Sequence, residues 1–97
     1  MIYEHAHLVI DPARAADFEA ATPDARKALL DAPGCREVGI HRSPDQPGTY
    51  LLRVGWDRIE DHLEVFPTTP QAATLGEAIA GFFIEAPLVI HFEPGEV

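Results

Sequence analysis

Trp56 and His62 are the two residues of this sequence whose types and spacing best suit chemistry. Residues 50–54 are apolar and favour a β-strand, and residues 57–62, which follow Trp56, are typical of a helix. An indole can stack on an aromatic ring and hold a substrate oxygen through its N–H. An imidazole can act as a general base near neutral pH. We therefore expect a catalytic site where this strand meets this helix.

Both residues also have an ordinary structural role open to them. Trp56 is the only tryptophan, and a buried tryptophan often fills one end of a hydrophobic core. A helix that begins at residue 57 would direct one face at the sheet, made of Ile59, His62, Leu63 and Phe66. On that face, His62 is either a core residue bonded to a backbone carbonyl or a general base.

Glu4 is a third candidate for the catalytic site. It shares one face of the predicted first strand with Ala6 and Leu8. A buried carboxylate there is costly unless it is paired, and His62 or His91 would be the partner. Such a pair would orient the imidazole ring and raise the pKa of the histidine. Alternatively, Glu4 lies exposed at the end of the strand.

Three histidines form a looser pattern. His5 and His7 share the other face of the first strand, and His91 lies in a strand expected to pair with it. A His-x-His motif with a third histidine is a metal-ligand pattern, but no fixed spacing constrains His91 here. The same side chains would also suit an interface between two sheets, bonded to each other or to Arg53. We expect no metal ion.

The composition limits the partners of the chain. It has 97 residues and a net charge of −9, with seven lysines and arginines in total, so we expect neither nucleic acid nor an anionic membrane as a partner. Cys35 is the only cysteine, which agrees with a reducing compartment. No leader peptide and no apolar run of membrane-spanning length is recognisable. We expect a soluble, cytoplasmic protein.

Hydrophobic periodicity predicts four strands and three helical segments. Period-two patterns place the strands at residues 2–10, 35–42, 49–56 and 88–93. Three- and four-residue spacings place the helices at residues 13–31, 57–66 and 70–83. Pro23 would kink or split the first helix, and Thr69 would cap the third.

This order of elements predicts the fold. A βαββαβ sequence is that of a ferredoxin-like α+β domain with a four-stranded antiparallel sheet, and we expect residues 1–97 to form this one domain. Helices would cover one face of the sheet. The other face also carries large apolar residues, and a second copy of the chain is its simplest cover. We therefore expect a homodimer, packed sheet to sheet as a dimeric α+β barrel.

Short motifs along nearly the whole chain resemble the antibiotic biosynthesis monooxygenase superfamily. They are Glu4-His5-Ala6, Pro33-Gly34-Cys35, Pro47-Gly48-Thr49-Tyr50, Trp56 with Glu60-Asp61-His62, Phe82-Phe83, Pro87 and His91. The resemblance implies a homodimeric α+β barrel with a pocket between sheet and helices in each subunit. Its members include cofactor-independent oxygenases of aromatic polyketides and quinols, and haem-degrading enzymes.

The sequence departs from two branches of that superfamily. The haem-degrading branch has an Asn on strand one, where this chain has Ala6, and its His lies farther from the Trp than His62 lies from Trp56. The polyketide oxygenases use Trp, Tyr, Asn and Arg, to which Trp56 and Tyr50 would correspond. The chain contains no Asn, and residues 66–70 lack the Arg of a Phe-Arg-x-Ser-Pro run.

The resemblance and the residues together favour a monooxygenase that uses no cofactor. A phenol or anthrone would lose a proton to His62, with Glu4 as its partner, and the anion would react with O₂ while Trp56 N–H and Tyr50 O–H hold it. The substrate would be a small aromatic or apolar molecule, and the other residues predicted to bind it are Phe66, Phe82, Phe83, His91 and His5. The alternative is a ligand-binding protein, an isomerase or a dimeric scaffold without oxygenase activity.

Overall fold

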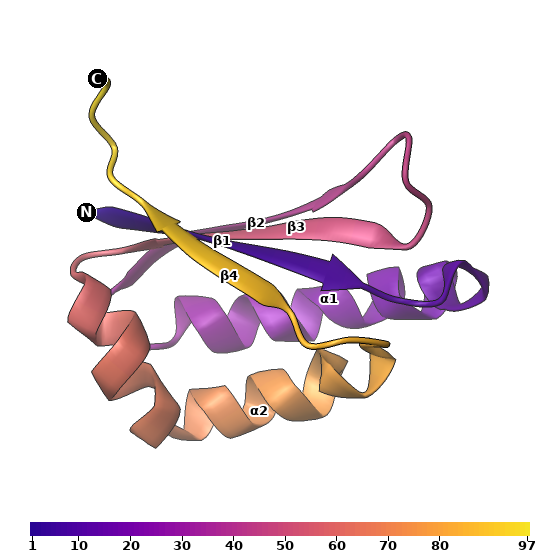
Figure 1. The fold of residues 1–97 in the computed structure, drawn as a ribbon. Coiled ribbons are helices and arrows are strands. Elements are labelled where there is room, and N and C mark those ends of the chain that lie inside the picture. The colour runs from indigo at the N-terminus through magenta and orange to yellow at the C-terminus, as the bar shows by residue number, and fades with distance from the viewer.

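The computed structural model describes residues 1–97 as one four-stranded antiparallel sheet with two α-helices against one face (Figure 1). The strands lie in the order β2-β3-β1-β4, with bounds β1 Ile2–Val9, β2 Cys35–Arg42, β3 Thr49–Trp56 and β4 Leu88–Phe92. The predicted α+β, ferredoxin-like topology is confirmed. β4 pairs with β1, as this topology requires.

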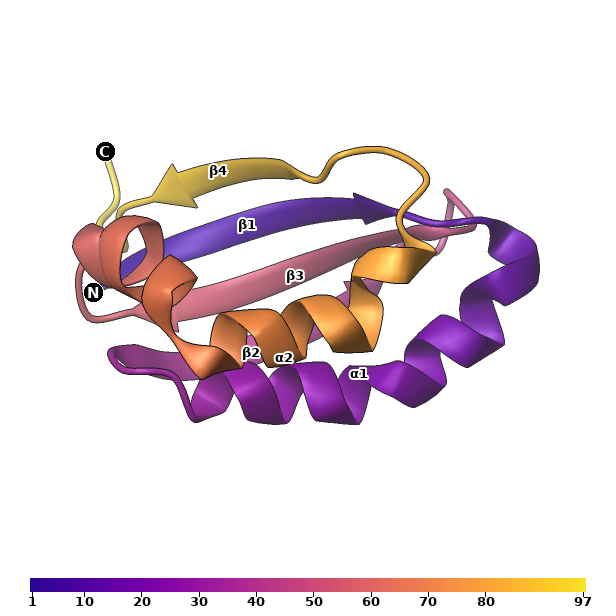
Figure 2. The same ribbon diagram turned by 90° about the horizontal axis from the view of Figure 1, so that it is seen from below.

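The two α-helices pack side by side under the sheet (Figure 2). α1 (Ala15–Leu30) follows a 3₁₀ turn, η1 (Pro12–Arg14), and Pro23 lies inside it, so the helix is not split there. α2 (Pro70–Ile79) begins as predicted, because the Thr69 hydroxyl accepts a hydrogen bond from the Ala72 amide at 3.3 Å. A 3₁₀ turn, η4 (Ala80–Phe82), completes the predicted third helix.

The segment between β3 and α2 differs from the predicted helix. It forms a π-helical turn, η2 (Asp61–Val65), and a 3₁₀ turn, η3 (Phe66–Thr68). Asp61 closes the residues before it into a turn, because its carboxylate accepts a hydrogen bond from the Arg58 amide at 3.2 Å. Leu63 is 55% exposed, so its predicted place on the inward face is wrong, while His62 and Phe66 do turn inward.

The alternation along β1 separates the two faces of the sheet. Glu4, Ala6 and Leu8 are buried on the face that the helices cover. Tyr3 and His5 lie on the opposite face, which no element of the chain covers (Figure 1). None of the helices has the length and hydrophobicity that crossing a membrane requires.

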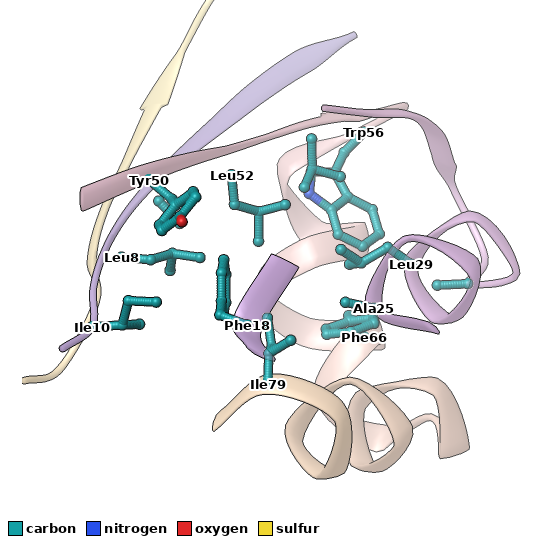
Figure 3. Close-up of a cluster of buried hydrophobic side chains, with 13 residues drawn as sticks. Leu8, Ile10, Phe18, Ala25, Leu29, Tyr50, Leu52, Trp56, Phe66 and Ile79 are labelled. Carbon is teal, nitrogen blue, oxygen red and sulfur yellow. The ribbon is translucent and has the colours of Figure 1, made fainter. Parts of the chain in front are cut away.

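The hydrophobic core lies between the helix-covered face of the sheet and the two helices (Figure 3). Trp56 and Phe66 lie near one end of this cluster, and Tyr50, Leu8 and Ile10 lie near the other. Trp56 and Phe18 are fully buried. The core therefore joins the two ends of β3, and only one of these ends carries the histidine and carboxylate of the predicted site.

Candidate functional site

The chemistry-bearing residues meet where β1, β3, β4 and η2 come together. Glu4 of β1 lies directly opposite His91 of β4 in the sheet register, and it is buried with 6% of its surface exposed. Trp56 is the last residue of β3, so the chain turns there and returns His62 from η2 to the same corner. Residues distant in sequence thereby form one cluster, made of Glu4, Trp56, His62 and His91.

A continuous chain of polar contacts links the four side chains. The indole Nε1 of Trp56 donates a hydrogen bond to Oε1 of Glu4 at 3.0 Å. Nε2 of His62 lies 3.3 Å from the same carboxylate oxygen. The other ring nitrogen of His62, Nδ1, lies 2.8 Å from Nε2 of His91. The predicted pairing of Glu4 with a histidine is therefore present, and both predicted histidines take part in the chain.

Packing fixes the orientation of the His62 ring. The imidazole stacks on the indole of Trp56, with ring centroids 5.3 Å apart and an interplanar angle of 11°. Phe66 closes the indole from another side, at a centroid distance of 5.5 Å. Held in this way, His62 can present one nitrogen to Glu4 and the other to His91, so the site positions it for proton transfer.

The hydrogen-bond roles depend on where the protons are. When Glu4 is ionised, His91 donates from Nε2 to Nδ1 of His62, and His62 donates from Nε2 to the carboxylate. When Glu4 is protonated, it donates to Nε2 of His62, whose Nδ1–H then donates to His91. In the second arrangement, Glu4 can pass its proton to Nε2 of His62 while Nδ1 of His62 passes its own proton to Nε2 of His91. These two transfers leave Glu4 ionised and His91 protonated.

Burial dominates the acid–base properties of the pair. Desolvation raises the pKa of Glu4, and the hydrogen bond from Trp56 opposes that rise. Burial and then repulsion from His91 lower the pKa of His62 to about 4. The prediction that the glutamate would raise the pKa of the histidine is therefore wrong. His62 is neutral near pH 7, and Glu4 is the group whose proton affinity is increased.

An apolar cavity of about 210 Å³ lies between the sheet and α2, beside Glu4. Its walls come from β1, β3 and α2 through Ala6, Leu8, Leu52, Ala72, Leu75 and Ile79. Glu4 is the only charged residue in these walls. Its Oε1 bonds to Trp56 and His62, whereas Oε2 makes no hydrogen bond within the protein and is not fully buried. The free oxygen is therefore available to a hydroxyl group of a ligand.

The structure separates several residues that were predicted to share the site. Phe83 lines the cavity, whereas Phe82 packs on Phe18 and beneath the guanidinium of Arg14. Tyr50 lies six residues before Trp56 on β3, which corresponds to about 20 Å at roughly 3.3 Å per residue. Its hydroxyl donates to Glu19 at 2.6 Å. Tyr50 and Trp56 therefore cannot hold one anion together, and that prediction is wrong.

The histidines of β1 lie away from the cavity. His5 occupies the uncovered face of the sheet, where its ring lies 4.8 Å from that of Phe92. His91 lies on the opposite face with His62, so His5, His7 and His91 do not converge on one point. No group of three or more histidine, cysteine, aspartate or glutamate side chains is arranged to hold a metal ion. His5 therefore does not contact the cavity, contrary to its predicted substrate-binding role.

The cavity itself was not predicted from individual residues. Its walls owe their shape to the small residues Ala6, Ala72, Gly76 and Ala80, whose short side chains leave the space unfilled. The signal was present in α2, where residues 72, 76 and 80 recur every four positions and share a face. In the sequence, that spacing resembles ordinary close packing of a helix on a sheet.

The fold and the site together define a ferredoxin-like α+β protein with a buried carboxyl–imidazole cluster beside an apolar cavity. The family model described as "Antibiotic biosynthesis monooxygenase" matches residues 1–74. Because the match covers more than half of the sequence, this chain belongs to the antibiotic biosynthesis monooxygenase family. The matched region includes Glu4, Trp56 and His62, and it ends before His91.

Solved structures show the same fold over nearly the full length of the chain. A candidate antibiotic biosynthesis monooxygenase from Bordetella bronchiseptica is 33% identical, with a TM-score of 0.92, and the match covers 98% of this chain and 97% of that one. A similar candidate from Caulobacter crescentus CB15 is 25% identical, with a TM-score of 0.81, covering 98% and 90%. No curated protein matches the sequence.

A third structure in this group contains a ligand. It is a monooxygenase from the gene ActVA-Orf6 of Streptomyces coelicolor, in complex with nanaomycin D. It is 20% identical to this chain, with a TM-score of 0.78, and the match covers 99% of this chain and 88% of that one. At this identity the likeness concerns the fold.

Proposed function

We propose that this protein is a cofactor-independent monooxygenase that acts on an aromatic hydroxyl compound of the phenol, quinol or polyketide type. Membership of the antibiotic biosynthesis monooxygenase family supports oxygenation as the reaction class. The observation that carries the proposal is the buried Glu4, which lines an apolar cavity, has one carboxylate oxygen without a hydrogen bond and connects through His62 to His91. This arrangement suits removal of a proton from a substrate bound in a water-poor space.

The reaction starts with deprotonation. Oε2 of Glu4 accepts the hydroxyl proton of the substrate, and the raised pKa of the carboxyl group makes this transfer less unfavourable than it would be to an exposed glutamate. The resulting anion is electron-rich and transfers one electron to O₂. The two radicals then combine into a carbon–oxygen bond, the resulting peroxide anion takes up a proton from water, and the hydroperoxide loses water. Overall, an aromatic C–H or CH₂ carbon and O₂ give a carbonyl group and one molecule of water.

The two histidines return the site to its starting state. Both imidazoles first change tautomer, so that Nε2 of His62 and Nε2 of His91 carry no hydrogen. A half-turn of the protonated Glu4 carboxyl group then presents its proton to Nε2 of His62, and Nδ1 of His62 passes its own proton to His91. His91 is partly exposed, so it can release that proton to water. His62 therefore acts as a relay between Glu4 and His91, which replaces its predicted role as the base that contacts the substrate.

Oxygen uptake with Glu4→Gln tests this assignment. The amide keeps the size of the side chain but removes the base, and loss of general-base catalysis lowers turnover by about 100-fold or more. Glu19→Gln is the matched control, because Glu19 bonds to Arg42 and Tyr50 outside the cavity and should keep full turnover. Wild-type turnover of hydroquinones and 2-anthrol by the Glu4→Gln variant would contradict the proposed role of Glu4. No oxygen uptake by the wild type with either substrate class would contradict the oxygenase function.

An isomerase is the second candidate, because the same acid–base chain could move a proton between two carbons of one substrate. The observation in its favour is the coupling of Glu4 and His62, which can both accept and return a proton. An oxygenase needs O₂, whereas an isomerase does not. Turnover of an enolisable substrate under anaerobic conditions would therefore favour isomerisation, and strict dependence on O₂ would exclude it.

We further propose that the chain forms a homodimer through the uncovered face of the sheet. This face carries the exposed side chains Leu88, Ile90 and Phe92 of β4 next to Tyr3 and His5 of β1. Exposed apolar side chains grouped on one face are typical of protein–protein contacts. Ile90→Glu would bury a charge at this contact, so it should sediment as a monomer where the wild type sediments as a dimer. A monomeric wild type at micromolar concentration would contradict the dimer.

A further inference from the structure

We infer that the substrate of this site is a neutral molecule with one aromatic ring, whose hydroxyl group donates a hydrogen bond to Oε2 of Glu4. This inference rests on the proposed function and narrows it from aromatic compounds in general to single-ring phenols and hydroquinones. It depends on the size of the cavity, the charge of its walls and the one free acceptor within it.

The volume of the cavity selects the size of the ligand. The cavity has a volume of about 210 Å³. A cavity of about 150 Å³ with apolar walls is sufficient to bind benzene, whereas pockets for drug-sized ligands span about 300–1,000 Å³. One ring with one or two small substituents therefore fits the available space, and three fused rings do not.

The charge of the walls excludes an anionic ligand. Glu4 is the only charged residue that lines the cavity, and no arginine or lysine accompanies it. The cations near the uncovered face and the η2 turn are engaged elsewhere, because Arg53 pairs with Glu37 and Arg58 pairs with Asp61. A carboxylate or phosphate on the ligand would be desolvated beside Glu4 without a counter-charge, which strongly disfavours binding.

The free acceptor fixes how the ligand is oriented. Oε1 of Glu4 already accepts from Trp56 and lies next to Nε2 of His62, so only Oε2 remains for a ligand. The rest of the wall is almost entirely apolar. One end of the ligand must therefore carry a hydrogen-bond donor, and its remainder must be hydrocarbon, which is the chemistry of a phenol.

Gly76 offers a direct way to change the cavity volume. It lines the cavity on the same face of α2 as Ala72 and Leu75, and a Cβ atom at this position would meet nothing within 4 Å. Replacing Gly76 with Leu would therefore place a branched side chain into the space that the ring occupies. Ala73 lies on the exposed side of the same helix, so Ala73→Leu adds a similar side chain outside the cavity.

Titration followed by NMR tests the inference without requiring turnover. Trp56 is the only tryptophan, so its indole N–H gives one resonance, and that N–H donates to the carboxylate that would receive the ligand. Phenol should shift this resonance saturably, with a dissociation constant on the order of 1 mM or tighter. 4-Ethylphenol should bind at least as well, while benzoate and the three-ring phenol 2-anthrol should bind at least about tenfold more weakly.

The variants locate the binding site. Gly76→Leu should weaken phenol binding by about tenfold or more, and Ala73→Leu should leave it unchanged. The inference is overturned by 2-anthrol or benzoate binding as tightly as phenol, by an unshifted indole resonance at saturating phenol, or by unchanged phenol affinity in Gly76→Leu. If Gly76→Leu does not fold, competition between phenol and 2-anthrol in the wild type still decides the size limit.

These outcomes separate the inference from the proposed oxygenase function. Binding of single-ring phenols without oxygen uptake would refute oxygenation and leave the ligand class intact. Oxygen uptake with three-ring substrates but no binding of single-ring phenols would refute the ligand class and leave oxygenation intact.

Discussion

Replacing His62 with Phe should remove an acid sensitivity from the stability of the fold. In the unfolded chain, His62 takes up a proton as the pH falls through its ordinary pKa of 6.5, but in the folded protein burial lowers that pKa to about 4. Between these values the unfolded state binds more protons, so the free energy of unfolding decreases as the pH falls. Above about pH 7.5 both states are neutral at this residue, and the full stability is present.

The magnitude follows from the two pKa values. At about 1.36 kcal/mol per pH unit, the gap between 6.5 and about 4 corresponds to about 3 kcal/mol, of which about 2 kcal/mol is lost by pH 5. The phenyl ring introduced by His62→Phe would keep the stacking on Trp56 but could not bind a proton. The wild type should therefore lose about 2 kcal/mol more than the variant between pH 7.5 and pH 5.

Urea unfolding followed by the fluorescence of Trp56 measures this difference, because the only tryptophan is fully buried in the folded state. Glu4 is present in the wild type and in His62→Phe, so the pH-dependent contribution of Glu4 to the free energy of unfolding largely cancels when the two proteins are compared. His7→Phe is the control, because His7 is exposed and outside the cluster. A wild type that is stabilised at pH 5 relative to His62→Phe would refute the reasoning, since it would mean that His62 and Glu4 form an ion pair in which attraction exceeds the cost of burial.

Two further substitutions test local features of the fold. Gly34→Ala should lower the free energy of unfolding by more than about 2 kcal/mol, because residue 34 has φ +79° and an added Cβ atom would collide with the Asp61 carboxylate. Gly81→Ala, at an open position, should leave the stability nearly unchanged, and equal stability of the two variants in urea would contradict the prediction. Tyr50→Phe should lower the free energy of unfolding by about 1 kcal/mol, because the hydrogen bond to Glu19 is lost, and it should leave the affinity for phenol unchanged. Weaker phenol binding by this variant in the NMR titration would show that Tyr50 does reach the site.

The sequence predicted the elements whose patterns are strong and local. The strands 35–42 and 49–56 have the predicted bounds because period-two alternation and the proline- and glycine-rich turn between them mark both ends. Thr69 was recognisable as a helix cap from its own chemistry and the proline after it. The segment after Trp56 was predicted wrongly, because the turn there depends on the contact of Asp61 with Arg58 and not on helical periodicity.

Part of the site was also predictable, because strand alternation and strand pairing are local and regular. The face shared by Glu4, Ala6 and Leu8 and the expected pairing of the first and last strands placed Glu4 near His91 and a partner histidine. The family resemblance favoured placing Tyr50 and Trp56 in one site. The rise per residue along a strand is enough to show that these two residues lie too far apart for that. The direction of the pKa shift of His62 could not be predicted, because it depends on the balance between burial and the neighbouring Glu4 and His91.

The position of β1 in the middle of the sheet has a consequence for how the protein folds. This strand pairs on one side with β3 and on the other with β4. Each residue of β1 that pairs with β4 is more than 80 positions from its partner in the sequence, as in the pairing of Tyr3 with Phe92. Contacts of such long sequence separation slow folding, because the chain must lose much of its freedom before they form. During synthesis, Glu4 on β1 therefore stays without its neighbour His91 until the ribosome has released β4.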